Sequence, residues 1–169
     1  AWVALYILLG AFFYVVVYTW WLKRRTHLNA VIGGAAGSFA VWAGWAAVEP
    51  RLSSPALVLG LLMFLWTPLH FWNFALVFAG EYRRAGIPMM PVVVGESTAR
   101  WHIAGAALAV FAASLLPWAL GYFGWLYLAS AAALSPLLWG NLRLLWRTKL
   151  AWQNYKLSGP YFLGLLVAL

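Results

Sequence analysis

Long apolar runs with almost no charge inside them constrain this chain more than any other feature. The first run covers residues 1–22 and ends at the basic cluster Lys23, Arg24 and Arg25. A helix needs about 20 apolar residues to cross the hydrocarbon core of a bilayer, so a run of this kind has the length of a membrane span. The sequence therefore predicts an all-α, polytopic transmembrane helix bundle. Five further runs follow, over about residues 30–48, 55–79, 103–120, 125–145 and from 160 to the end of the chain.

The composition predicts that lipid is the surrounding solvent. The chain is 66% hydrophobic and only 8% charged, which leaves too little polar surface for a protein dissolved in water. It contains no Cys, so disulfides, zinc–thiolate sites and thiol nucleophiles are excluded. Both Ala1 and Leu169 lie inside apolar runs, and both ends look cut. We expect residues 1–169 to form a single transmembrane domain that is part of a longer protein.

The basic residues predict how the chain is oriented in the membrane. Ten of the eleven Lys and Arg residues lie in or beside the loops that follow the first, third and fifth runs, and only Arg51 lies on the other side. Basic loops stay on the cytoplasmic side, so these loops should face the cytoplasm across a plasma or inner membrane. The same rule accounts for the net charge of +8, and no nucleic-acid partner is expected. The ten residues are Lys23, Arg24, Arg25, Arg83, Arg84, Arg100, Arg143, Arg147, Lys149 and Lys156.

A polar stripe follows one side of the third run. His70 lies deep in this run, and an ionisable side chain inside a membrane span is a functional candidate. At about 100° per residue, Glu81 returns to nearly the same helix face, and Thr67 and Asn73 flank that face. The stripe predicts a cavity that opens at the cytoplasmic end. The alternative for His70 is a buried histidine whose polar atoms are satisfied by a neighbouring helix.

The second run carries a stripe of small residues, formed by Gly33, Ala36, Gly37, Ala40 and Gly44. Such a stripe lets another helix approach closely, which makes helix packing the favoured interpretation. The alternative is that the absence of large side chains makes room for a flat ligand.

The loop after the third run combines a carboxylate with two guanidinium groups. It reads EYRRAGIPMMPVVVGEST over residues 81–98, and its two prolines stiffen an apolar stretch suited to capping a cavity. Glu81 is expected on the same side as the cluster at residues 23–25. Together these groups can hold a diphosphate, with the acid reaching it through a divalent cation and the guanidinium groups pairing with its oxygens. Two simpler interpretations stay open, namely an ion pair between Glu81 and an Arg, and cations that only follow the positive-inside rule.

Three strings of the sequence carry a family resemblance. They are YTWWLKRRTHLNAVIGGAAGSFAVWAGWAAV at residues 18–48, LWTPLHFWNFAL at 65–76 and EYRRAGIPMMPVVVGE at 81–96. These strings resemble the haem O synthase branch of the UbiA superfamily of membrane prenyltransferases, and the match covers nearly the whole chain in the right order. The residues near the end that are similar to the last conserved stretch of that branch are Ala151, Tyr155, Lys156, Ser158 and Tyr161.

The resemblance implies a fold and a reaction. The fold is a nine-helix bundle around a central cavity, of which this chain would supply the last six helices. In the reaction a farnesyl group leaves its diphosphate and is joined to a vinyl group of protohaem IX (haem b), and water adds the hydroxyl group of haem O, which leads to the haem A of respiratory oxidases. The implied partners are farnesyl diphosphate, protohaem IX, the lipid bilayer and haem A synthase. The implied cofactor is Mg²⁺ bridging the diphosphate, with haem b as a substrate.

The resemblance also implies roles for particular residues. Glu81 stands where the second acidic motif of the superfamily holds metal and diphosphate, so it is expected to be a metal ligand and a catalytic residue. His70 is expected to be catalytic and to face the haem or the prenyl cation. For the tryptophans nearby, helix packing is the alternative. The expected diphosphate clamp is Lys23, Arg24, Arg25 and Arg83, and the expected substrate cavity is Trp66, Thr67, Trp72, Asn73 and Tyr82.

Two departures from the family pattern bear on activity. Much of the superfamily has a second acid four residues after the first in this loop, where this chain has Ala85. The first acidic motif, an Asn followed by spaced Asp residues, is missing, because the acids of this chain are Glu49, Glu81 and Glu96. We therefore expect this segment alone to be inactive.

Three other functions remain open. Another UbiA-type aromatic prenyltransferase, acting on a quinone precursor or a chlorin, would share the fold and the metal chemistry but would not be expected to carry LWTPLHFW. A transporter or channel segment would use the polar stripe to line a solute path, and it would predict inverted repeats that the sequence does not show. A purely structural membrane subunit would use neither feature.

Overall fold

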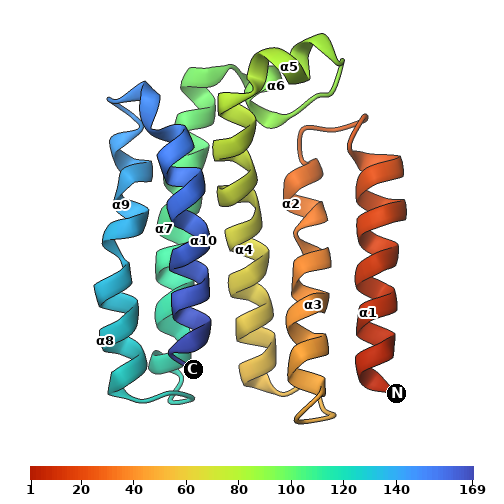
Figure 1. Ribbon diagram of the computed structural model, residues 1–169, viewed down its shortest axis with the longest axis vertical. Coiled ribbons are helices and arrows are strands. Elements are labelled where there is room, and N and C mark those ends of the chain that lie inside the picture. The colour runs from red at the N-terminus through yellow and green to blue at the C-terminus, as the bar shows by residue number, and fades with distance from the viewer.

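The computed structural model describes the backbone of residues 1–169 and every side chain except that of Thr148. The described residues form helices and no strands, and the helices stand side by side in six columns (Figure 1). This confirms the all-α class, and each column corresponds to one of the predicted apolar runs. The columns are α1 (Trp2–Phe12) continued by the π-helix η1 (Phe13–Leu22), α2 (Asn29–Gly33) with α3 (Ala35–Ala46), α4 (Ser54–Val77), α7 (Glu96–Ala119), α8 (Trp125–Leu134) with α9 (Pro136–Arg143), and α10 (Ala151–Val167).

The outside of the bundle is suited to lipid. The second and fifth columns are interrupted at Gly34 and Ser135, and α10 has 17 residues. Large apolar side chains remain exposed, among them Trp20 at 81% and Leu126 at 79%. Soluble proteins rarely expose extended apolar surface, so this chain is a membrane protein. Among the described residues, the columns that are long and apolar enough to span a membrane alone are Trp2–Leu22, Ser54–Val77 and Glu96–Ala119.

The last column begins earlier than the sequence predicted. α10 starts at Ala151, and Pro160, which was expected to start the helix, lies inside it. The prediction was wrong because proline, although it removes a backbone hydrogen bond and crowds the preceding turn, is tolerated inside membrane helices, where neighbouring groups satisfy the freed carbonyl. The polar residues before it do not form a loop, since Asn154 and Ser158 are buried. α7 likewise begins before its apolar run, at Glu96.

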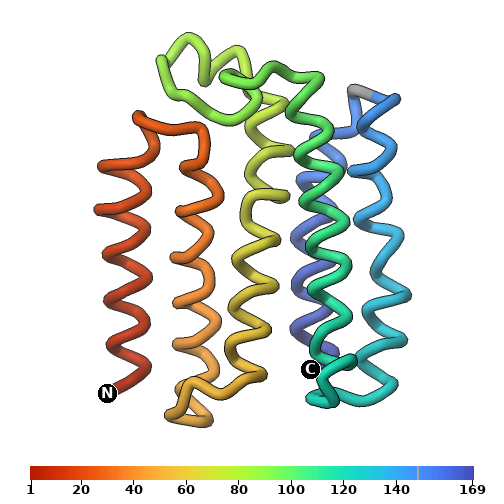
Figure 2. Tube along the Cα trace, turned by 180° about the vertical axis from the view of Figure 1, so that it is seen from behind, coloured from red at the N-terminus to blue at the C-terminus, as the bar shows by residue number. Residues whose placement is uncertain are grey.

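The three basic loops lie at one end of the bundle, called here the basic end (Figures 1 and 2). They are the turn from η1 to α2, the segment with α5 (Ala79–Arg84) and α6 (Met90–Val94), and the link through the 3-10 turn η2 (Thr148–Leu150) to α10. The α5–α6 segment lies across this end above α2 and α4. Residues 47–53, residues 120–124 and both chain ends lie at the opposite end. The loops that the sequence predicted to share one side therefore do so.

α4 stands in the middle of the bundle and divides it into two regions. On one side α4, α7, α8, α9 and α10 form a continuous core, called here the packed region, in which Leu69 and Tyr161 are fully buried. On the other side α1, η1, α2 and α3 form the open region, where α1 meets α3 through a small separate cluster of Tyr6, Ala43 and Ala46.

Two hydrogen bonds attach the open region to α4. Ser38 of α3 donates its hydroxyl to the Gly60 carbonyl at 2.8 Å, and the Trp42 indole donates to the Ala56 carbonyl at 2.9 Å. A side chain at Gly60 would collide with the Trp42 ring, since an added Cβ would overlap the indole nitrogen. These contacts fix α3 against the half of α4 that is farther from the basic end.

Candidate functional site

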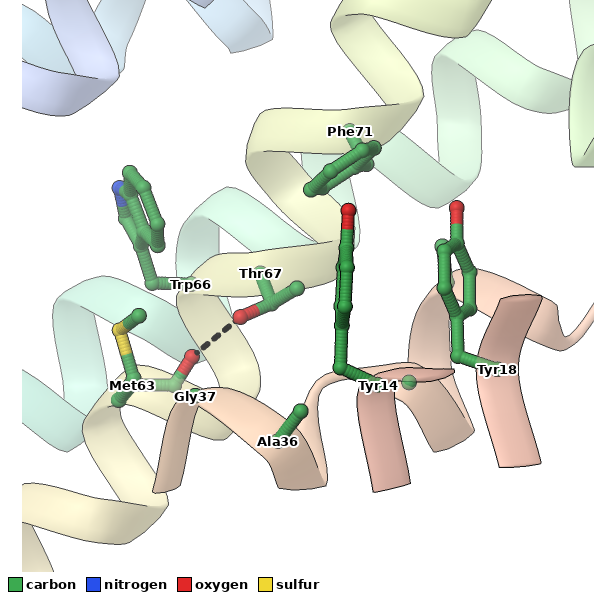
Figure 3. A pocket seen from close by; sticks show the side chains of 10 residues that line it. Tyr14, Tyr18, Ala36, Gly37, Met63, Trp66, Thr67 and Phe71 are labelled. Atoms are coloured by element: carbon green, nitrogen blue, oxygen red, sulfur yellow. Dashed lines mark hydrogen bonds between the residues drawn. The ribbon is translucent and has the colours of Figure 1, made fainter. Parts of the chain in front are cut away.

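A cavity of about 180 Å³ lies in the open region, between η1, α2, α3 and α4 (Figure 3). Its walls are almost entirely apolar. Apolar cavities with few polar groups are the usual form of small-molecule sites, and this one is suited to part of a hydrocarbon chain. The lining residues are Tyr14, Tyr18, Ala30, Gly33, Ala36, Gly37, Met63, Trp66, Thr67 and Phe71.

The small-residue stripe forms one wall of this cavity. At Gly33 an added Cβ would lie 2.5 Å from a ring carbon of Tyr18, and at Gly37 it would lie 2.9 Å from the Met63 methyl carbon. The glycines therefore allow close packing of the aromatic and methionine side chains that border the cavity. Gly44, farther along the same stripe, has nothing within 4 Å of such a Cβ. The stripe thus combines helix packing with the free space that the alternative interpretation required.

η1 supplies the aromatic wall. In a π-helix each N–H bonds to the carbonyl five residues earlier, and π segments often occur at functional sites. Thr19 adds a side-chain bond of the same span, donating to the Tyr14 carbonyl at 2.8 Å. The rings of Tyr14 and Tyr18 stack at 5.8 Å, and Figure 3 shows them on the same side of the helix. Phe71 of α4 lines the same cavity. Neither tyrosine was among the predicted cavity residues, although their four-residue spacing was a usable signal.

Two of the predicted cavity residues on α4 line the cavity. The Trp66 indole donates to the Ser158 carbonyl at 2.8 Å, so α10 fixes the position of this ring. Thr67 donates its hydroxyl to the Met63 carbonyl at 2.9 Å within α4 (Figure 3). The hydroxyl proton of Thr67 is thereby used inside the helix, which keeps this wall apolar.

His70 lies one helical turn nearer the basic end than Trp66 and Thr67, on the same face of α4. Its Nδ1 is 2.7 Å from the Ser158 hydroxyl oxygen. Its ring stacks on Trp66 at 4.5 Å and on Tyr155 at 4.3 Å. The structure thus contains the contact with a neighbouring helix that is expected of a buried histidine. The His70 ring is turned toward α10, and His70 is not among the residues that line the cavity.

The other two predicted cavity residues on α4 point elsewhere. Asn73 is fully buried in the packed region, where its amide donates to the Asn141 carbonyl oxygen at 2.7 Å. Trp72 lines a separate groove of about 520 Å³ between α4 and α7, and its ring meets His102 edge-on at 6.2 Å. The polar stripe predicted on one face of α4 is therefore divided between the cavity and the core.

Glu81 and the predicted cations lie at the basic end. The Glu81 carboxylate is exposed and lies 3.3 Å from the exposed Arg84 guanidinium. This is the ion pair that the simpler interpretation anticipated, and an exposed pair of this kind contributes little to stability. Of the predicted clamp, Lys23 is half-buried, whereas Arg24, Arg25 and Arg83 are exposed.

The basic end offers donors for an anion rather than a complete metal site. Among the described residues, no group of three or more His, Cys, Asp or Glu side chains is placed to hold a metal ion. Tyr82 of α5 is half-buried, and burial raises the pKa of its phenol, so this hydroxyl stays protonated and can donate a hydrogen bond at neutral pH.

These features define a membrane-embedded helix bundle that can hold a hydrocarbon chain inside and an anionic group at its basic end. Comparison with known families names the class more closely. The chain belongs to the UbiA prenyltransferase family, whose model matches residues 1–165.

Several relatives have curated names. Protoheme IX farnesyltransferase 1 of Paramagnetospirillum magneticum is 48% identical over 98% of this chain and 60% of its own length. Protoheme IX farnesyltransferase of Metallosphaera sedula is 44% identical over 96% of this chain and 57% of its own length. A second farnesyltransferase of P. magneticum is 53% identical over 78% of this chain and 45% of its own length. The chain therefore spans 60% or less of each of these relatives. No solved structure matches the chain.

Proposed function

We propose that the protein containing this chain is a protohaem IX farnesyltransferase, or haem O synthase. It transfers farnesyl from farnesyl diphosphate to a vinyl group of haem b, giving haem O for haem A biosynthesis. The observation that carries the proposal is the identity of 44%, 48% and 53% to relatives of that name over most of this chain. These names favour this activity over a transporter and over transfer to a quinone precursor.

The arrangement of cavity and cations supports the same reaction. Breaking the allylic carbon–oxygen bond moves negative charge onto the diphosphate, and cationic groups already in place stabilise that charge. The apolar walls, which include Trp66 and Thr67, keep water away from the allylic cation before transfer. Tyr82 is the proposed hydrogen-bond donor between cavity and diphosphate. The proposed diphosphate clamp is Lys23, Arg24, Arg25 and Arg83.

Glu81 fits the part of a metal ligand for the diphosphate. Mg²⁺, the proposed ion, is commonly bound through one or two carboxylates together with substrate phosphates and waters. The ion pair with Arg84 uses Oε1 of Glu81, and among the described residues Oε2 has no partner. The ion would neutralise part of the diphosphate charge.

The setting of the reaction follows from the charge distribution. We propose that the basic end faces the cytoplasm across a plasma or inner membrane, because basic loops are retained on that side. Farnesyl diphosphate would bind with its anionic group at this end and its chain in the cavity, and haem would enter from the lipid bilayer. Haem A synthase is the proposed partner that receives the product.

Product analysis tests the proposed function. The complete protein, expressed from its whole coding sequence and placed in lipid nanodiscs, is incubated with farnesyl diphosphate, Mg²⁺ and haem b. We expect mass spectrometry to detect haem O, and no farnesylated product when 4-hydroxybenzoate replaces haem b. Farnesylation of 4-hydroxybenzoate alone would overturn the proposal.

Replacement of Glu81 tests its proposed part in the site. Glu81→Ala should abolish farnesyl transfer, because no other acid lies on α5 to share the metal. Glu49→Ala, which removes an acid at the opposite end of the bundle, should leave the rate unchanged. Near-normal turnover of Glu81→Ala in the same assay would remove Glu81 from the site.

A further inference from the structure

The hydrogen bonds of His70 assign different states to its two ring nitrogens. Nδ1 lies 2.7 Å from the Ser158 hydroxyl oxygen, and that hydroxyl lies 2.8 Å from the Tyr155 carbonyl oxygen. A carbonyl oxygen only accepts, so the single hydroxyl proton of Ser158 goes to Tyr155, and the Ser158 oxygen accepts from His70. Nδ1 therefore carries the proton of the neutral ring. Nε2 carries the lone pair, and it bonds to no described residue.

The surroundings of the ring restrict the plane of the imidazole. Trp66 stacks on the imidazole with 21° between the planes, and Tyr155 packs on it with 32°. Trp66 is itself held by its indole bond to the Ser158 carbonyl. Ser158 is fully buried on α10, so one residue positions both the indole and the imidazole. A histidine whose second nitrogen is fixed in this way is arranged as a base or a ligand is in proteins.

His70 lies beside the cavity, one helical turn nearer the basic end. Trp66 and Thr67 line the cavity, and His70 follows them by four and three residues on the same helix face. Phe71, another lining residue, packs edge-on against the His70 ring at 5.9 Å. The imidazole therefore packs against two residues that line the cavity, Trp66 and Phe71.

The chemistry of prenyl transfer releases one proton, and this step rests on the proposed function. The carbon–oxygen bond of farnesyl diphosphate breaks, and the leaving diphosphate takes the electron pair. The π electrons of the acceptor form the new carbon–carbon bond, which leaves a cation on the acceptor. That cation is discharged either by losing a proton from carbon or by adding a water molecule that loses a proton. Both routes need a proton acceptor, because a water-poor site has no solvent to take the proton.

We propose that His70 Nε2 is this general base and that Ser158 is its positioning residue. The proton passes from the acceptor, or from the water that adds to it, to the Nε2 lone pair. The Ser158 oxygen still accepts from Nδ1–H after the transfer, so the hydrogen-bond chain to Tyr155 stays intact. Proton transfer by a positioned side chain accelerates a reaction by about 10²- to 10⁴-fold.

Single-turnover kinetics of farnesyl transfer to haem b, with the complete protein in nanodiscs, tests this base. His70→Asn keeps an amide able to bond with Ser158 but has no nitrogen at the Nε2 position. We expect its rate to fall about 100-fold or more with unchanged affinity for farnesyl diphosphate. Added imidazole should restore part of the rate of His70→Ala. His102→Asn is the matched control, because His102 also bonds through Nδ1, to the Thr98 carbonyl at 2.9 Å, and its rate should not change.

Two variants of Ser158 test the positioning role. Ser158→Ala should lower the single-turnover rate, and Ser158→Thr, which keeps the hydroxyl, should restore it. The proposal that His70 is the general base would be overturned by a wild-type rate in His70→Asn. It would also be overturned if imidazole did not restore activity to a folded His70→Ala protein. Equal rates in both Ser158 variants would overturn the positioning role. Absence of farnesylated haem from the wild-type protein would instead overturn the proposed function itself.

Discussion

The packed and open regions on either side of α4 differ in what their large side chains touch. In the packed region Leu69, Ile103 and Leu165 are almost completely enclosed by other side chains. In the open region Met63 and Phe71 border a cavity instead. The difference shows that one helix can take part in two kinds of packing, because the contacts with α7 and α10 enclose one face of α4 while part of its other face borders the cavity.

The largest expected difference between the two regions is in the free energy of unfolding, measured after truncating one side chain on each face of α4. Leu69→Ala removes a fully buried side chain, and we expect it to lower the free energy of unfolding by about 2–5 kcal/mol. Met63→Ala enlarges a cavity that already exists, so its loss should be clearly smaller. Reversible unfolding by sodium dodecyl sulfate in mixed micelles measures both values. Equal losses would mean that the two faces of α4 are packed alike.

Glycine substitution sharpens the comparison within the open region. In Gly33→Ala the new Cβ would lie 2.5 Å from the Tyr18 ring, so the ring must shift and the cavity must change shape. We expect farnesyl transfer to fall about tenfold or more, since small misplacements in a site are costly. Gly44→Ala, on the same stripe, should keep full activity and gain up to about 1 kcal/mol of stability. The cavity assignment would fail if both variants kept wild-type kinetics.

The smallest expected effect concerns the polar pair of the packed region. Asn73 and Asn141 are both fully buried and bond to each other at 2.7 Å. A double-mutant cycle with alanine at each position should give a coupling free energy of about 0.6 kcal/mol, the average for such bonds between membrane helices, and no more than about 1.7 kcal/mol. Farnesyl transfer by Asn73→Ala should follow its folded fraction. If fully folded Asn73→Ala lost turnover, Asn73 would have to be counted among the residues of the substrate cavity, as the sequence predicted.

Most of the fold could be predicted from the sequence, because a long apolar run directly indicates a helix that lies in the membrane. The six columns and the shared side of the basic loops were predictable from run length and from the positions of Lys and Arg. The start of α10 was not, because a proline usually marks a helix start but is also tolerated inside a membrane helix. η1 was not predictable either, since no residue type in Phe13–Leu22 specifically favours bonds to the fifth preceding carbonyl.

The residues of the candidate site were predictable only where the spacing along one helix, or the family resemblance, determines which side chains face the cavity. Thr67 was placed at the cavity by its position beside His70 on one helix face, and Trp66 was placed there by the family resemblance. Tyr14 was not, because which face of η1 meets α4 depends on its π geometry. The bond between His70 and Ser158 joins residues 88 positions apart, and no local pattern reports such a contact. The hydrogen bond from Asn73 to Asn141 also joins residues far apart in the sequence. Because of this bond, Asn73 lies in the core and not in the cavity, where it was predicted.

The π geometry of η1 makes the length of that helix adjustable. A π turn holds more residues than an α turn, so a change of hydrogen bonding from the fifth to the fourth preceding carbonyl would lengthen the segment without breaking it. That change would raise Lys23, Arg24 and Arg25 away from the cavity and rotate Tyr18 at the same time. The height of the cations above the membrane interior and the width of the space below them are therefore set by one backbone register.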